Sequence, residues 1–148
     1  LYSLVMDTYS FGYSSSGFTD MPMNHKIFLA QFDAIKKLAS EGPCVMVGRC
    51  ADYALSEYKD CFSVFVHADI DWRINRLSQK HNKTAKEAKD MINKTDKSRS
   101  SYYNYYTNKK WGAASSYNLC VDSSKLGIDG AAKAIIQAIE IFDSIKNK

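Results

Sequence analysis

The sequence lacks the features that mark several common classes of protein. No apolar run approaches the roughly 20 residues that a membrane-spanning helix needs, and no segment has the pattern of a signal peptide. The four cysteines include no C-x-x-C pair, and the three histidines have no metal-ligand spacing. Both absences argue against a zinc site or a disulfide framework. They predict a cytoplasmic protein with reduced thiols and no metal-ligating side chains of this kind, and the missing apolar span predicts no membrane partner.

A further absence concerns phosphate chemistry. The sequence contains no G-x-x-x-x-G-K-S/T motif, the glycine-rich loop whose backbone cradles nucleotide phosphates. Residues 14–18 (SSSGF) have neither the lysine nor the spacing of that loop. Phosphate binding, if present, therefore has to be sought in other residues.

What is present is the composition of one ordinary globular domain. The chain has 148 residues, of which 45% are hydrophobic and 24% charged, enough for a real core. The net charge of +4 is modest. It suits a phosphate-binding pocket as well as contact with nucleic acid.

Apolar periodicity predicts strands that alternate with helices. The first 24 residues are rich in tyrosine, serine and glycine and predict loop. Short apolar runs predict three strands, at residues 44–47, 62–66 and 119–122. A period of 3.6 predicts helices from Asn24 to Gly42, at 51–58, after Asp69, from Thr84 to about Tyr106, and at 128–145. This order predicts a single α/β domain, 1–148, with a parallel sheet. Because three strands make a small sheet, we expect the chain to be the later part of a larger α/β domain.

Arginines follow the predicted strands. Gly48 and Arg49 close the first apolar run, and ligands of α/β sheets bind beyond such strand ends. Arg73, Arg76 and Lys80 share one face of the helix predicted after Asp69. A solvated basic face explains this spacing about as well as phosphate binding does. Arginine tilts the balance towards phosphate, because its planar fork matches that group.

The helix that begins at Thr84 carries a second polar face. Asp96, Arg99, Tyr103 and Tyr106 lie along it. Asp96 and Arg99 are either a plain ion pair, worth about 0.2–0.5 kcal/mol, or a grip on a nucleotide. The tyrosines of residues 102–106 and Trp111 have three interpretations: core packing, base stacking and interface packing.

Seven segments in order carry a family resemblance. They are 29–31 (LAQ), 41–52 (EGPCVMVGRCAD), 63–68 (SVFVHA), 94–99 (KTDKSR), 102–107 (YYNYYT), 111–112 (WG), and 118–123 (NLCVDS) with 126–128 (LGI). Through them the chain resembles the cytidylate kinase-like family, a branch of the P-loop nucleoside monophosphate kinases. The resemblance implies a three-layer α/β/α fold with a helical lid at about 71–110.

The resemblance also implies roles for individual residues. Arg49 matches an arginine that binds the acceptor phosphate, and Asp96 and Arg99 match the pair that holds the cytidine nucleotide. Arg73 and Arg76 match lid arginines that close over the donor phosphates. Cytidylate kinases usually carry Gly-Arg-Asp, whereas here Cys50 follows Arg49 and the first acidic residue is Asp52. The missing phosphate loop lies near the N-terminus in this family, so we expect an N-terminal segment upstream of residue 1.

The resulting functional hypothesis is ATP- and Mg²⁺-dependent phosphorylation of a nucleoside monophosphate, with CMP or dCMP as the first candidate. One alternative is a regulatory protein that binds nucleotides without turnover, and another is a kinase for a different small acceptor. RNA binding ranks last, because the positive charge is interleaved with acids along the chain. The surplus of tyrosines would suit a homo-oligomer interface.

Overall fold

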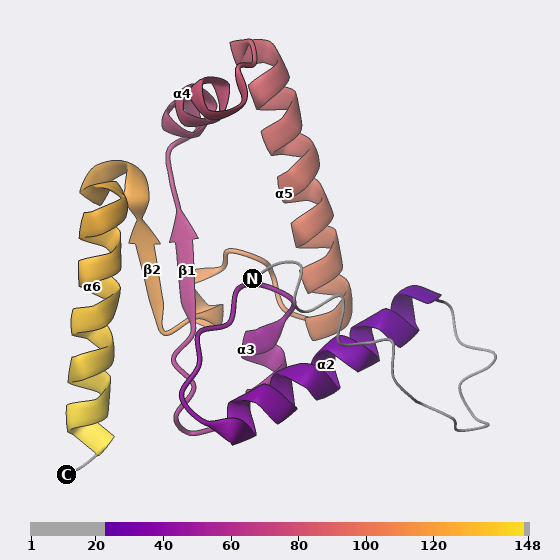
Figure 1. Cartoon of the computed structure of the whole chain (residues 1–148), viewed down its shortest axis with the longest axis vertical. Helices are drawn as coiled ribbons and strands as arrows, with labels where there is room; N and C mark the ends of the chain where they lie inside the picture. The colour runs from indigo at the N-terminus through magenta and orange to yellow at the C-terminus, as the bar shows by residue number, and fades with distance from the viewer. Residues whose placement is uncertain (1–22, 147–148) are drawn as a thin grey trace. The chain divides into compact units, whose positions relative to one another are not determined.

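The structure is a computed structural model that describes residues 23–146 (Figure 1). It divides into two compact units, Leu1–Tyr58 and Lys59–Lys148, which are described separately. Residues 1–22, where the sequence predicts loop, lie outside the described part. None of the described helices combines the length and apolar character of a membrane span.

Among its described residues, 23–58, the first unit holds two helices. Helix α2 (Met23–Glu41) confirms the prediction of a helix between Asn24 and Gly42, and it buries Phe28 and Ile35. Phe32 on α2 meets the ring of Tyr53 on α3 at a centroid distance of 6.2 Å. Helix α3 (Ala51–Ala54) is shorter than the helix expected at 51–58.

The strand predicted at residues 44–47 is wrong for the described chain. The segment forms no strand, and Val45 and Val47 are 92% and 79% exposed. A strand needs a neighbour to satisfy its backbone hydrogen bonds, and no described segment pairs with this one. The apolar pattern indicates residues suited to burial, but it does not supply the partner that would bury them.

The second unit contains a small parallel sheet. Strands β1 (Val64–His67) and β2 (Leu119–Asp122) pair in register from Val64 with Leu119 to His67 with Asp122. Helix α6 (Ser123–Lys146) packs on both strands and departs from helical geometry at Gly127. The arrangement is compatible with an α/β fold. Two strands do not establish the expected three-layer P-loop architecture.

An aromatic cluster packs around β1. The ring of Phe65 lies 5.3 Å from Trp111 and 5.0 Å from Tyr117, measured between centroids. Gly112 has a φ of +76°, and a Cβ there would lie 3.1 Å from the Phe65 ring. Glycine is therefore needed at this position both for the backbone conformation and for the close approach. The short 3₁₀ helix η2 (Ala114–Ser116) lies between Trp111 and Tyr117.

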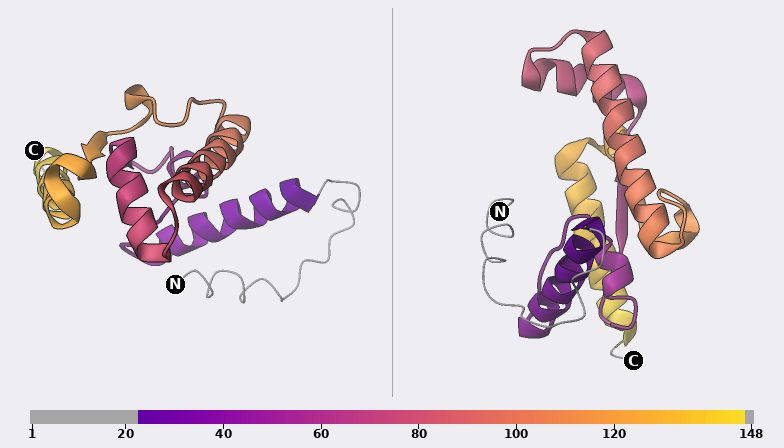
Figure 2. Two further views of the ribbon diagram at one scale, coloured as in Figure 1. Left: turned by 90° about the horizontal axis from the view of Figure 1, so that it is seen from above. Right: turned by 90° about the vertical axis from the view of Figure 1, so that its right-hand side faces the viewer.

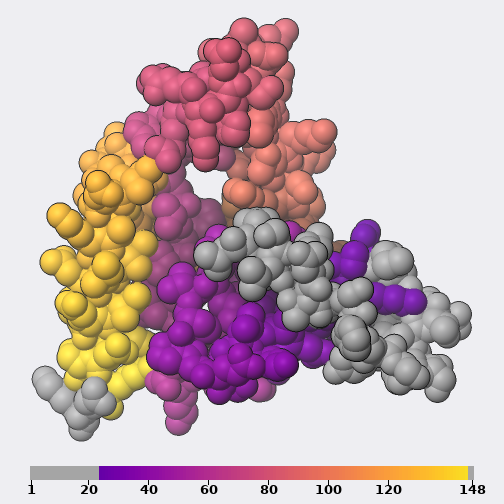
Figure 3. Space-filling model, in the orientation of Figure 1, coloured from indigo at the N-terminus to yellow at the C-terminus, as the bar shows by residue number. Residues whose placement is uncertain are grey.

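Helices α4 (Ile70–His81) and α5 (Ala85–Thr107) form a hairpin that follows the carboxyl end of β1. The two helices contact each other and are joined at the top of Figure 1, from where α5 extends back down past the level of the strands. Figure 2 shows the pair from two further sides, and in Figure 3 the atoms of α4 and of the start of α5 form the upper lobe. Thr84 and Glu87 form the predicted capping box at the start of α5. Ala88 and Ile92 of α5 are buried, whereas α4 buries none of its residues. The apolar core of the hairpin is accordingly thin.

Candidate functional site

Hydrogen bonds join the elements at the carboxyl edge of the sheet. The Ser123 hydroxyl donates to the His67 carbonyl over 3.0 Å, and the Asp69 N–H donates to the Ser124 hydroxyl over 3.1 Å. The Ser124 hydroxyl and N–H both donate to Asp122, which lowers the pKa of that carboxyl. Asp69 is also the N-cap of α4. The start of α4 is thereby fixed to the ends of both strands.

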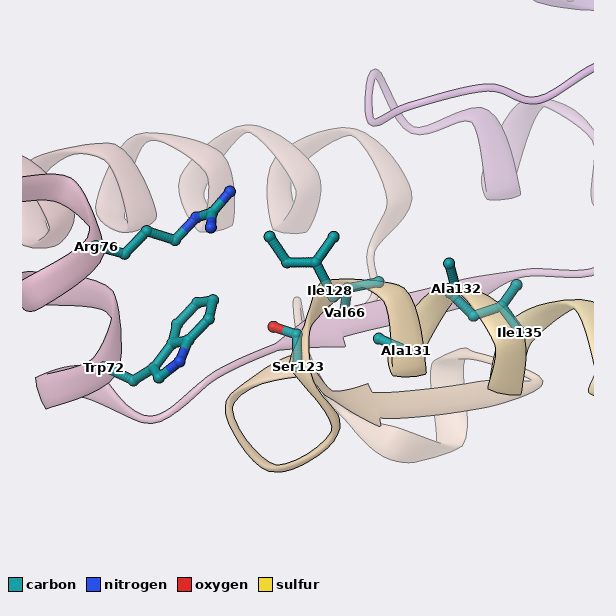
Figure 4. A pocket seen from close by; sticks show the side chains of 8 residues that line it. All are labelled: Val66, Trp72, Arg76, Ser123, Ile128, Ala131, Ala132 and Ile135. Atoms are coloured by element: carbon teal, nitrogen blue, oxygen red, sulfur yellow. The ribbon is translucent and has the colours of Figure 1, made fainter. Parts of the chain in front are cut away.

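A pocket of about 300 Å³ opens beside this edge (Figure 4). The residues that line it come from β1, α4 and α6; they are Val66, Trp72, Arg76, Ser123, Ile128, Ala131, Ala132 and Ile135. Most of this wall is aliphatic. The polar side chains among these residues are Arg76, the Trp72 indole and Ser123, whose hydroxyl donates to the His67 carbonyl.

Trp72 and Arg76 lie one turn apart on α4 and give the pocket its chemical character. The Arg76 guanidinium carbon lies 5.5 Å from the centroid of the indole, within cation–π range. Arg76 is exposed and forms no ion pair with any residue that the structure describes. An aliphatic wall, a large aromatic ring and a guanidinium without an ion-pair partner together suit a ligand that has a flat heteroaromatic ring and an anionic group.

Arg73, on the same helix, has a different environment. Its two terminal nitrogens donate to the two carboxylate oxygens of Asp96 on α5, over 2.7 and 2.8 Å. The side chains of Arg73 and Asp96 are 31% and 26% exposed. The hydrogen bonds to Asp96 raise the pKa of the Arg73 guanidinium, although burial opposes that shift. This is a bidentate, partly buried ion pair.

An ion pair between helices, from Arg73 to Asp96, therefore takes the place of the pair that the spacing allowed within α5. Asp96 turns to Arg73, and Arg99 is exposed without an ion-pair partner in residues 23–146. Of the three interpretations of the tyrosines, core packing is confirmed for Tyr103 and is wrong for Tyr105. Tyr103 is 6% exposed and stacks near Tyr117, whereas Tyr105 is 78% exposed.

Arg49 and Asp52 belong to the first unit. Gly48, Arg49 and Cys50 have φ values of 71°, 56° and 56° in succession. Such values are unfavourable for residues other than glycine, and strain of this kind gathers at functional sites. Burial, reinforced by Asp52 and opposed by Arg49, raises the pKa of the Cys50 thiol to about 11. Cys50 is thus a neutral thiol at physiological pH, and the neighbouring Arg49 side chain is exposed.

The structure thus brings together some of the predicted site residues. Arg73 and Asp96 are in contact, and Arg76 reaches a pocket within the same unit. Sequence reasoning missed Trp72 and the wall contributed by α6. The spacing of Trp72 and Arg76, one helical turn apart, was the available signal. Among residues 23–146, no group of three or more His, Cys, Asp or Glu side chains is arranged to hold a metal ion.

Comparison with known proteins settles the family. The sequence profile of the cytidylate kinase-like family matches residues 1–125. The chain belongs to the cytidylate kinase-like family. A crystal structure of an uncharacterized protein from Eubacterium ventriosum ATCC 27560 is similar, with a TM-score of 0.76 and 33% sequence identity over 80% of this chain and 74% of that one. No curated protein matches the chain. Membership in this family indicates a kinase-like function.

Proposed function

We propose that the protein takes part in ATP-dependent phosphoryl transfer to a nucleoside monophosphate, with CMP or dCMP as the first candidate acceptor and the cytoplasm as its location. The observation that carries this proposal is the pocket at the carboxyl edge of the sheet, where Trp72 and Arg76 face an aliphatic wall. Ligands of parallel α/β sheets bind at this edge. A nucleotide supplies both the flat ring and the anionic group that the pocket suits.

In this proposal the pocket receives the donor nucleotide. The base lies against Trp72 and the aliphatic residues of α6, while Arg76 offers its guanidinium to a phosphate. Phosphoryl transfer asks a protein mainly to position two phosphates and to neutralise developing charge. Arg76, and the N–H groups of Arg73 that Asp96 leaves free, would serve the second purpose. Bound Mg²⁺ would add charge neutralisation on the donor phosphates.

The acceptor side of the proposal rests on the family. In the second unit, Arg99 is proposed to bind the acceptor phosphate. In the first unit, Arg49 and Asp52 keep the acceptor-binding roles that the family resemblance implies. Arg49 and Arg99 are exposed, and neither forms an ion pair with a described residue, so both guanidinium forks are open to an anion. Arg99→Lys would keep the charge and lose the fork. Unchanged acceptor affinity in this variant would remove Arg99 from the site.

The test of the proposed function is a titration of the chain with ATP, ADP, CMP and dCMP by calorimetry, followed by an ATP-coupled transfer assay. The expected result is saturable binding of an adenine nucleotide and of one pyrimidine monophosphate, with turnover of that pair. The intact mass of the natural polypeptide belongs to the same experiment. A mass well above 16.7 kDa would require the assay to be made on that longer protein.

A second candidate is a protein that binds nucleotides without transferring phosphate. The observation that favours it is the missing G-x-x-x-x-G-K-S/T motif, since that loop normally holds the donor phosphates. Binding of nucleotides with no turnover, in a natural polypeptide of 16.7 kDa, would establish this candidate over the kinase. Absence of nucleotide binding would contradict both.

A further inference from the structure

The ion pair between Arg73 and Asp96 uses some of the hydrogen-bonding groups of each side chain and leaves others free. Each carboxylate oxygen of Asp96 accepts one hydrogen bond from a terminal nitrogen of Arg73, over 2.7 and 2.8 Å. A guanidinium carries five N–H groups, so three remain free when two bind a carboxylate end-on. Arg73 can therefore hold Asp96 and an anion together, while each oxygen of Asp96 accepts one hydrogen bond from Arg73.

The position of the pair in the hairpin gives it mechanical importance. Arg73 lies in the first turn of α4, and its N–H binds the carbonyl of Asp69, the residue that is tied to Ser124 at the sheet edge. Asp96 lies one turn beyond the buried Ile92 of α5. The ion pair therefore joins α5 to the base of α4, a helix that buries none of its own residues.

We propose that Asp96 is a positioning residue that acts through Arg73. Its carboxylate fixes the Arg73 guanidinium and holds the base of the hairpin closed, so that the free N–H groups of Arg73 point to a phosphate of the bound nucleotide. The ligand-facing half of this inference rests on the proposed function. It differs from the role implied by the family resemblance, in which Asp96 itself contacts the cytidine nucleotide.

The experiment compares Asp96→Asn with the charge swap Arg73→Asp/Asp96→Arg in the full chain. Asp90→Asn is the matched control, because Asp90 is an exposed carboxylate on the same helix. Two readouts are taken for each protein. Hydrogen exchange of the α4 amides reports the attachment of the hairpin, and calorimetry with ADP reports ligand binding.

We expect Asp96→Asn to speed the exchange of the α4 amides by about fivefold or more and to weaken ADP binding by about the same factor, since a charged hydrogen-bonded pair is lost. The swap restores the pair, so exchange returns to within about twofold of the wild type. ADP binding stays at least about tenfold weaker in the swap, because residue 73 now repels the phosphate. The control Asp90→Asn changes neither readout.

Three results would overturn the inference. Weaker ADP binding with unchanged exchange in Asp96→Asn would mean that Asp96 touches the ligand directly. Recovery of both readouts in the swap would make Arg73 purely structural. Unchanged values of both readouts in Asp96→Asn would remove the residue from both roles. A wild-type chain that binds no ADP would defeat the proposed function and the ligand-facing half, while the exchange data would still decide whether Asp96 fastens the hairpin.

Discussion

Two arginines one turn apart on α4 have opposite surroundings. Arg73 is held by a carboxylate on α5, and Arg76 lies over an indole at the mouth of a pocket without an ion-pair partner among the described residues. The difference separates two tasks that a guanidinium performs. A paired guanidinium orders the structure around it, whereas an unpaired one at a pocket is available to an anionic ligand.

The comparison also shows how a basic helical face should be interpreted. Arg73, Arg76 and Lys80 are equivalent in the sequence pattern, which assigns them one face of α4. In the structure, Arg73 and Arg76 differ in the group that each side chain contacts. For Arg73 it is Asp96, 23 positions along the chain. For Arg76 it is the pocket that α6 completes.

The largest effect is expected from Arg76→Ala. Removal of a guanidinium that binds a phosphate should weaken ADP binding about 10- to 100-fold, because hydrogen bonds to charged groups are worth about 1.5–3 kcal/mol. The thermal midpoint should stay unchanged, since Arg76 is exposed and unpaired in the described part of the chain. Calorimetry and a thermal melt measure the two quantities. If Arg76→Ala bound ADP as tightly as the wild type, the assignment of ligand binding to Arg76 would be contradicted.

The next effect is expected from Trp72→Ala. Loss of a stacking surface should weaken ADP binding by about tenfold, given about 1–3 kcal/mol for each stacked base. Inorganic triphosphate lacks a base, so its affinity should remain within about twofold of the wild type. Competition titrations with the two ligands measure this difference. Equal losses for both ligands would mean that Trp72 supports Arg76 rather than a base.

Arg73→Lys should affect stability more than Arg76→Lys. The lysine keeps the charge and loses the bidentate geometry, and the pair is about one-third exposed. We expect the free energy of unfolding to fall by about 1 kcal/mol for Arg73→Lys and by less than about 0.5 kcal/mol for Arg76→Lys. Chemical denaturation measures both. The opposite order would contradict the assignment of the structural role to Arg73.

The smallest effect is expected at the far end of the hairpin. Thr84→Ala removes the N-cap of α5 and should cost about 0.5–1 kcal/mol at neutral pH. The hydrogen bond from the Thr84 hydroxyl lowers the pKa of Glu87 below its ordinary value. The part of the cap that depends on this hydrogen bond is therefore complete above the ordinary carboxyl pKa and is lost as the pH falls through the lowered pKa of the folded state. The hydrogen bond that the Thr84 hydroxyl accepts from the Glu87 N–H does not depend on this carboxyl. Denaturation at a series of pH values checks this. A difference that grows as the pH falls would contradict it.

The sequence predicted the helices and two of the strands well. The capping box at Thr84, the long helix that reaches the tyrosines and the strand at 119–122 are all confirmed. These features depend on local pattern. The strand at 44–47 was predicted from the same kind of pattern, but it fails because pairing depends on a second segment.

The candidate site was predicted less completely for a similar reason. Arginine positions followed from motif and spacing. The spacing allowed Asp96 and Arg99, three residues apart, either an ion pair or a joint grip on a nucleotide, whereas Asp96 pairs with Arg73 on another helix. The pocket wall from α6 had no signal of its own, because alanine and isoleucine at helical spacing usually indicate core. Contacts between elements decide both features, and a local pattern does not encode them.

The most direct test of the central claim uses the two tryptophans of the chain as internal probes. Trp72 lines the pocket, while Trp111 packs against Phe65 in the aromatic cluster. We expect titration with ADP to shift the NMR resonance of the Trp72 indole N–H in a saturable manner and to leave that of Trp111 in place. A shift of Trp111 alone, or of neither indole at millimolar ADP, would contradict nucleotide binding at the carboxyl edge of this sheet.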